Sequence, residues 1–412
     1  MTDVEIDPFE RFNRAMGMGK IQDPYPAFAA SRPKGIEKAD LRLLLGEDAA
    51  AQGALAEGGP PIYTAYSYDA VCQVLRDGDT FSSKMYEAVM GIVMGHTILE
   101  MDEPEHRQYR TLLQQAFTKK SLEHWEHELV RPVIDRLIDK FIDRGRAELV
   151  TELTLPFPVD VVAGLFGIPD EEMKQFHIWT VELISVGLDF EGALRASGEI
   201  RDHLKVLLEE RRAAGCVGDD LLSILGRAEL DGHRLTDDEI FAFCRLLLPA
   251  GAETTYRSSS NLLYGLLHNP EQLDLVRNQP ATMIPKAIEE GLRWEPPLLT
   301  IMRQATRDTE VCGVPIEKGA IVITNLGSAN HDTGRWDNAE AIDVLREQHQ
   351  HMAFAFGPHM CLGQHLARME TRVLLEQIFA RLPNLRLDPD GDVGPITGLT
   401  FRSPTALPVT WG

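Results

Sequence analysis

The sequence has few cysteines for its length, and they form no pattern. Five cysteines are scattered through 412 residues, with no CxxC pair among them. This arrangement excludes a secreted-type disulfide framework and a cysteine-held metal cluster, and it favours a reducing compartment, so we expect a cytoplasmic protein. The five are Cys72, Cys216, Cys244, Cys312 and Cys361.

Long apolar runs and positive charge are also scarce. No run approaches the roughly 18 apolar residues that a membrane span needs, and the start, MTDVEIDPFERFNRAMG, has no apolar export region. Forty-one Lys and Arg against 63 Asp and Glu give a net charge of −22, which disfavours nucleic-acid binding. No G-x-G-x-x-G follows a predicted strand, so no flavin or nicotinamide module is expected. The sequence therefore predicts a soluble protein with neither a membrane nor a nucleic-acid partner.

No repeat, low-complexity tract or linker divides the chain, and we expect residues 1–412 to form a single domain. Apolar residues recur mostly at helical spacing, whereas strand-like runs are short and late, so the predicted fold is mainly α with a minor β region. Gly46–Pro61 is typical of a surface loop. The predicted helices are Glu103–Gly145, Glu171–Val186, Phe190–Ala214, Asp237–His268 and Thr282–Trp294, and the predicted strands are Glu310–Val314, Ala320–Asn325 and Thr405–Thr410.

The segment around Cys361 changes from loop to helix. Residues 351–369 read HMAFAFGPHMCLGQHLARM, with Gly and Pro in the first half and helical spacing in the second. Backbone N–H groups at a helix start stabilise a thiolate, so we expect a lowered pKa for the Cys361 thiol. Three interpretations stay open: a small buried hydrophobe, a nucleophile with His359 or His365 as its base, and an axial haem ligand.

A second segment, Ala250–Thr255, places a glycine, an acid and two threonines in the middle of the predicted helix Asp237–His268. These are poor choices for a helix interior, and the strongly apolar flanks predict a helix that is buried nearly all round. A buried Glu253 beside the Thr254 hydroxyl therefore indicates proton handling rather than a solvated face. Pro249 lacks an N–H, which predicts a kink or widening there.

Two charge patterns have helical spacing. Glu290 and Arg293 lie three residues apart, and His106 and Arg110 lie four apart, so each pair shares one helix face. Taken alone, either pair is compatible with ordinary surface charges worth a few tenths of a kcal/mol.

The cysteine segment closely resembles the signature of the cytochrome P450 family. Phe354, Gly357, His359, Cys361 and Gly363 match its Phe, Gly, His, Cys and Gly positions in register. Two positions depart from it, because alanine replaces the first glycine at position 355 and a proline follows at 358. The methyl group at 355 is tolerable if that residue keeps a negative φ. The resemblance runs from about Asp23 to near the C-terminus.

The resemblance implies the P450 fold, a helical haem-enclosing body with small mixed sheets, and a monooxygenase that inserts one oxygen atom of O2 into a substrate. Cys361 would be the axial ligand of the iron of haem b. Glu253 and Thr254 would be the acid–alcohol pair beside the bound oxygen. Glu290, Arg293 and Arg346 would form a structural cluster. The remaining cofactor-binding residues would be His106, Arg110, Arg303, Phe354 and His359.

Electrons would come from a separate ferredoxin and its NAD(P)H-dependent reductase, docking on a basic patch of Arg107, Lys119, Lys120 and Arg368, although these are equally compatible with ordinary solvated charges. The expected substrate is apolar, since the candidate pocket segments are mostly aliphatic, although these residues are equally compatible with an ordinary hydrophobic core. Rival interpretations are a peroxide-driven haem-thiolate enzyme, a haem-containing sensor and a cysteine hydrolase. The candidate pocket residues are Met90, Val93, Leu248, Ala250, Leu299, Ile301 and Leu399.

Overall fold

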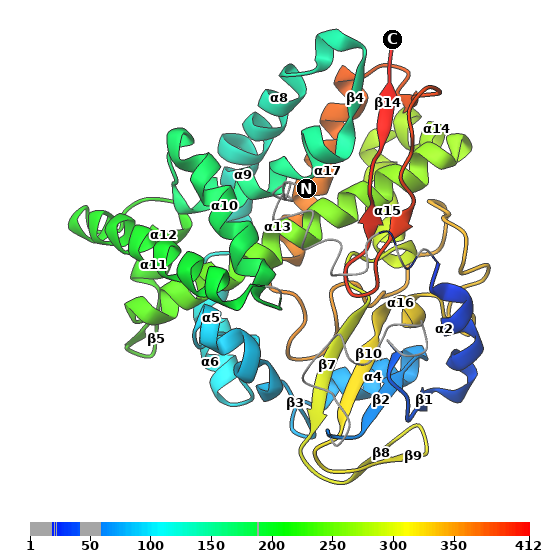
Figure 1. The fold of residues 1–412 in the computed structure, drawn as a ribbon. Helices are drawn as coiled ribbons and strands as arrows, with labels where there is room; N and C mark the ends of the chain where they lie inside the picture. The colour runs from blue at the N-terminus through cyan, green and yellow to red at the C-terminus, as the bar shows by residue number, and fades with distance from the viewer. Residues whose placement is uncertain (1–18, 20, 22, 42–58, 188) are drawn as a thin grey trace, which may run out of the picture.

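The computed structural model describes residues 19, 21, 23–41, 59–187 and 189–412 (Figure 1). Most of the predicted loop Gly46–Pro61 lies outside these residues. Within the described part of the chain, no helix is both long and apolar enough to cross a membrane.

Most of the described chain is helical. The α-helices are α2 (Tyr25–Ser31), α4 (Tyr68–Arg76), α5 (Ile92–Met94), α6 (Glu105–Gln114), α7 (Lys119–Trp125), α8 (Arg131–Asp139), α9 (Pro156–Phe166), α10 (Met173–Ile184), α11 (Phe190–Ala213), α12 (Leu221–Arg227), α13 (Asp237–His268), α14 (Pro270–Asn278), α15 (Pro280–Trp294), α16 (Leu326–Asn330) and α17 (Gln364–Arg381). Short 3-10 or π turns are Arg32–Lys34, Lys84–Tyr86, Glu87–Gly91, Glu126–Val130, Ile142–Arg144, Val150–Thr154, Asp170–Glu172 and Ser185–Gly187.

The strands are short and form small sheets. They are β1 (Ile36–Glu37), β2 (Ile62–Ala65), β3 (Phe81–Ser82), β4 (Arg146–Glu148), β5 (Glu229–Leu230), β6 (His233–Arg234), β7 (Thr300–Ala305), β8 (Thr309–Val311), β9 (Val314–Ile316), β10 (Ile321–Asn325), β11 (Arg386–Leu387), β12 (Ile396–Thr397), β13 (Ser403–Pro404) and β14 (Pro408–Thr410).

Helix α13 is the centre of the helical part (Figure 1). Its start is fixed by a capping box, in which the Thr236 hydroxyl accepts from the Glu239 N–H while the Glu239 carboxylate accepts from the Thr236 N–H. The helix continues unbroken through Pro249 to His268. It packs on α9, α11, α15 and α17, and its apolar side chains join the largest hydrophobic core.

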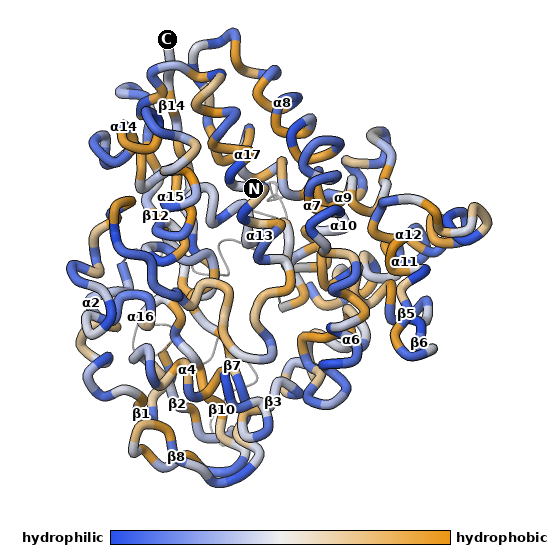
Figure 2. Tube along the Cα trace, turned by 180° about the vertical axis from the view of Figure 1, so that it is seen from behind, coloured by the Kyte–Doolittle hydropathy of each residue, from blue (hydrophilic) through white to orange (hydrophobic). Residues whose placement is uncertain are grey.

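The outer helices turn one apolar face toward this core. Along α8, Val133, Ile134, Leu137 and Ile138 are buried, and Figure 2 shows the resulting alternation of apolar and polar residues on that helix. This spacing is the periodicity that the sequence analysis used to predict helices.

A five-stranded mixed sheet forms the other part of the molecule, in the order β1-β2-β10-β7-β3. β2 and β10 are parallel, whereas β7 is antiparallel to β10. Helices α4 and α16 pack near this sheet (Figure 1), where a second hydrophobic core forms. The sheet matters for the site because β7 carries Arg303.

The predicted elements agree with the structure except at turns. The helix predicted over Glu103–Gly145 is divided, because Thr118 caps a new helix by accepting from the Ser121 N–H. The strand predicted at Glu310–Val314 is wrong. It is a hairpin of β8 and β9, since Cys312 and Gly313 adopt φ values of 47° and 82° and turn the chain.

Candidate active site

Cys361 lies in the loop that leads into α17. Its backbone N–H donates to the carbonyl oxygen of Phe354 at 2.8 Å, and the N–H of Met360 donates to the carbonyl of Gly357 at 3.1 Å. These bonds fold the loop back on itself, so the Cys361 side chain is held half-buried just before the helix begins.

The loop depends on two unusual backbone conformations. Ala355 adopts a φ of 59°, so the condition of a negative φ is not met, and this alanine takes a left-handed conformation that a glycine adopts without steric penalty. Gly357 has a φ of 75°, and a Cβ there would lie 2.2 Å from the carbonyl oxygen of Leu75. Glycine at 357 therefore lets the loop pack directly against the end of α4.

The expected lowering of the Cys361 pKa is wrong for the polypeptide. Burial raises the pKa of this thiol above its ordinary value, although the N–H groups of Gly363 and Gln364 and the charges of Arg110 and Arg368 act in the opposite direction. A metal ion bound to the sulfur would oppose this effect of burial and favour the thiolate.

Helix α13 exposes a short stretch where its flanks are buried. Ala250 is exposed and Thr254 partly so, one turn apart. The Thr254 hydroxyl donates to the Ala250 carbonyl at 2.7 Å, the back-bonding expected of a mid-helix threonine.

Glu253, the acid of the predicted pair, is buried and held by Arg257. The Arg257 Nε lies 2.7 Å from Glu253 Oε1, and its Nη2 contacts the same oxygen. Arg257 also donates to the Ser403 hydroxyl at 3.0 Å. Arg257 thus positions the carboxylate of Glu253, and the spacing of the motif did not reveal this partner.

Four nitrogen-bearing side chains from three segments gather beside the cysteine loop. The rings of His106 on α6 and His359 in the loop lie 4.1 Å apart. Arg110 donates to the Met360 carbonyl at 2.6 Å, and Arg303 is buried on β7. Burial lowers the pKa of His359 to about 3, and the charges of Arg303, His106 and Arg110 act in the same direction.

In this cation cluster (His106, Arg110, Arg303 and His359), His106 Nδ1 lies 3.3 Å from Glu103 Oε1, but the two arginines have no carboxylate partner in the described part of the chain. Among the residues that the structure describes, neither Arg110 nor Arg303 forms an ion pair with a carboxylate. The buried Nε2 of His106 has no hydrogen-bond partner in that same part of the chain. Buried cations of this kind fit a ligand that brings its own carboxylates.

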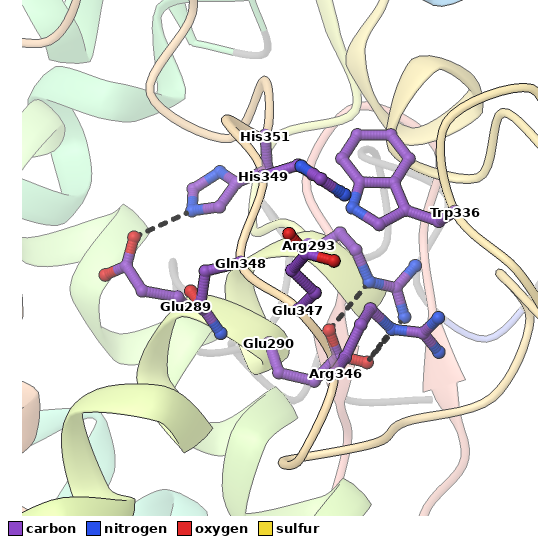
Figure 3. A pocket seen from close by; sticks show the side chains of 9 residues that line it. All are labelled: Glu289, Glu290, Arg293, Trp336, Arg346, Glu347, Gln348, His349 and His351. Carbon is purple, nitrogen blue, oxygen red and sulfur yellow. Dashed lines mark hydrogen bonds and ion pairs between the residues drawn. The ribbon is translucent and has the colours of Figure 1, made fainter.

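The other predicted cluster is neutralised internally. Arg293 makes a bidentate pair with Glu290, with both N–O distances at 2.8 Å, and the Arg346 Nε lies 3.1 Å from Glu290 Oε1 (Figure 3). Arg293 also donates to the carbonyls of Asn330 and Ala339. The structure thus brings Glu290, Arg293 and Arg346 together as a saturated, buried group.

The seven candidate pocket residues divide into two sets. Ala250, Met90 and Ile301 have surface available to a ligand, whereas the other four are buried in the hydrophobic cores. The buried four are Val93, Leu248, Leu299 and Leu399.

The proposed docking patch changes in one residue. Arg368 is paired with Glu289 at 2.6 Å, so it is no free surface charge, while Arg107, Lys119 and Lys120 are exposed. The hydrolase alternative loses support as well. His365 is exposed, and neither it nor His359 is hydrogen-bonded to Cys361 within the described residues.

Glu370 on α17 was not among the residues predicted from the sequence. This carboxyl is buried, and burial raises its pKa to about 8, against a smaller lowering by the Thr255 hydroxyl. The available signal was an acidic residue four positions after Leu366, on the apolar face of the helix.

The geometry places a half-buried cysteine beside two arginines that have no ion-pair partner among the described residues, the kind of site that a haem with two propionates fits. Comparison with known proteins gives the family. The family model "Cytochrome P450" matches residues 159–405. The steroid C26-monooxygenase of Mycobacterium tuberculosis (strain CDC 1551 / Oshkosh) is 35% identical over 74% of this chain and 83% of its own length. The cytochrome P450 monooxygenase PikC of Streptomyces venezuelae is 30% identical over 96% of this chain and 93% of its own.

Solved structures agree with these relatives. CYP109E1 from Bacillus megaterium, in complex with testosterone, superimposes with a TM-score of 0.82 and 27% identity, covering 95% of this chain and 99% of that one. The chain belongs to the cytochrome P450 family. It is therefore a monooxygenase with the P450 fold, which uses haem b as cofactor and O2 as cosubstrate.

Proposed function

We propose that this protein is a haem-thiolate monooxygenase in which Cys361 is the axial ligand of the haem iron. The observation that carries the proposal is that Arg110 and Arg303, which have no ion-pair partner among the described residues, lie in the cation cluster beside a half-buried cysteine. When bound, haem supplies the activation of O2, and its iron supplies the positive charge that stabilises the Cys361 thiolate.

The cation cluster would hold the haem propionates. Arg110 and Arg303 would supply the charge, and the unpartnered Nε2 of His106 would supply a hydrogen bond. His359 is positioned by the Ser83 hydroxyl, 3.3 Å from its Nε2. Phe354 would help to fix the loop around the sulfur, because its carbonyl accepts the Cys361 N–H.

Thr254 would hold and pass a proton at its Oγ1. That hydroxyl now donates to the Ala250 carbonyl, and rotation about χ1 would release it to donate to another acceptor. Glu253 would supply the proton after release from Arg257. We expect Thr254→Ala to consume several-fold more NAD(P)H per product formed, while Thr254→Ser stays close to the wild type. Equal coupling in Thr254→Ala and the wild type would contradict this role.

The substrate would be an apolar small molecule, and the electrons would come from a ferredoxin and its NAD(P)H-dependent reductase in the cytoplasm. Two relatives support the substrate class, since one is a steroid C26-monooxygenase and the other was crystallised with testosterone. Ala250, Met90 and Ile301 are the predicted pocket residues with surface available for apolar contact.

The absorption spectrum of the dithionite-reduced protein with CO tests the ligand. A strongly red-shifted Soret band is expected for the wild type, and its loss is expected in Cys361→His with haem still bound. Cys312→Ser serves as the matched control, because Cys312 lies in the β8–β9 turn and should leave the band in place. A band at the histidine-like position in the wild type would contradict the thiolate and favour the sensor interpretation.

A further inference from the structure

Glu289 is the neighbour of Glu290 on α15, yet it faces a different partner. In Figure 3 the Glu289 carboxylate points away from the arginines and toward His351. Its Oε1 lies 2.6 Å from the Arg368 Nε, and its Oε2 lies 2.9 Å from the Arg368 Nη2. This bidentate pair joins α15 to α17, the helix that follows the cysteine loop.

His351 is a second hydrogen-bond partner of the Glu289 carboxylate. The His351 Nδ1 accepts from the Ala353 N–H at 3.2 Å, so the ring carries its proton on Nε2, which donates to Glu289 Oε2 at 3.2 Å. Burial opposes ionisation of Glu289, but hydrogen bonds from Arg368 and His351 outweigh it and lower its pKa to about 2. Glu289 is thus a fixed negative charge at neutral pH.

Arg368 links this charge to the cysteine loop. Its guanidinium carbon lies 4.4 Å from the centre of the Phe354 ring, and its Nη1 donates to the Gln364 side chain at 3.0 Å. The carbonyl of Phe354 accepts the Cys361 N–H. The contacts therefore run without a gap from Glu289 through Arg368 and Phe354 to the cysteine.

We propose that Glu289 acts on the Cys361 site through Arg368, and that its carboxylate offsets the effect of the Arg368 charge on the reduction potential of the haem iron. The proposal rests on Cys361 being the iron ligand. When the ferric iron gains one electron, the site becomes more negative, so a nearby positive charge favours the reduced state and a negative charge opposes it. Arg368 and Glu289 nearly cancel as a pair, and each has an effect only when the other is removed.

The proposal predicts that removing the two charges of this ion pair shifts the reduction potential in opposite directions. A purely structural role of the pair does not predict this. Glu289→Gln should raise the potential, because Arg368 is left uncompensated, and Arg368→Gln should lower it. The double variant should return toward the wild type. We expect each single change to alter the ratio of reduced to oxidised protein about tenfold at fixed ambient potential, which is about 59 mV for one electron.

The measurement is a spectroscopic redox titration of the holoenzyme, in which dithionite supplies the electron and mediators equilibrate it. Glu376→Gln is the matched control, since Glu376 lies on α17 two turns beyond Arg368 and pairs with Arg372 on the same helix and with Arg131 on α8. It should leave the potential unchanged. Arg368→Lys keeps the charge and should stay closer to the wild type than Arg368→Gln.

Two outcomes would overturn the proposal. Shifts of the same sign in Glu289→Gln and Arg368→Gln would mean that either change merely loosens the loop, and unchanged potentials would mean that the pair does not act on the iron. Either outcome counts only if the variants keep the red-shifted CO band. If the wild type itself lacks that band, the ligand assignment fails instead, and the two failures remain distinct.

Discussion

Two buried charge clusters in this molecule use the same side chains for opposite purposes. The Glu290–Arg293–Arg346 cluster contains its own carboxylate and gives its remaining donors to backbone carbonyls. The cation cluster of His106, Arg110, Arg303 and His359 forms no ion pair between its arginines and a carboxylate in the described chain, and one buried nitrogen there lacks a partner. A neutralised cluster stabilises the fold, whereas an uncompensated one carries an energetic cost that only a bound anion removes.

The largest expected effect comes from removing the carboxylate of the neutralised cluster. Glu290→Gln leaves Arg293 and Arg346 buried without a counter-charge, which typically costs about 3–5 kcal/mol. We expect the unfolding free energy, measured by urea denaturation, to fall by that amount. A loss below about 1 kcal/mol would mean that the cluster is no more important than a surface ion pair.

Glu370 adds a third case to the comparison of the two charge clusters, because a proton rather than a cation neutralises this carboxyl. Its folded pKa of about 8 lies above the ordinary value of a carboxyl, so the folded state holds a proton that the unfolded state loses. Its contribution to the unfolding free energy is therefore fully present below about pH 4.3, the pKa of the carboxyl in the unfolded state. That contribution is lost as pH rises toward about 8.

Glu370→Gln should remove this dependence. Between pH 6 and pH 8 the wild type should lose up to about 1.4 kcal/mol per pH unit relative to the variant. Urea denaturation at several pH values measures the difference. Parallel stability curves for the two proteins would show that the carboxyl does not titrate in this range.

Arg303→Met tests the uncompensated cluster. Because Arg303 is buried and forms no ion pair with any residue that the structure describes, its loss should leave the unfolding free energy of the haem-free protein unchanged or higher. The holoprotein should lose haem about tenfold faster, since a hydrogen bond to a charged group is worth about 1.5–3 kcal/mol. Haem transfer to apomyoglobin measures the rate. Arg293→Met is the contrast, and it should destabilise the fold itself.

The sequence predicted the parts of the molecule that local chemistry determines. The bounds of α13 were correct because Thr236, Glu239 and the apolar period mark them. The Glu290, Arg293 and Arg346 cluster and the cation cluster came from the resemblance, since their members lie far apart in the chain. Arg368 and Glu289 are separated by 79 positions, and no local pattern connects them. The φ of Ala355 was missed because a methyl group ordinarily excludes that conformation, and only the surrounding loop imposes it.

The smallest expected effect concerns cations that are exposed to solvent rather than buried. Lys119 and Lys120 begin α7. This helix packs against α17, the helix that follows the cysteine loop. Lys119 is 90% exposed and its pair with Glu123 is 3.6 Å long, so changing it should not alter stability. If ferredoxin docks there, the double change to alanine should slow electron transfer a few-fold at low salt. The difference should vanish at high salt, because exposed charges are screened. Lys205→Ala, on α11, is the control. Equal slowing by Lys205→Ala would mean that the net charge of the protein, rather than a patch at Lys119 and Lys120, guides the partner. The contrast between compensated and uncompensated charges would then hold only for the buried clusters.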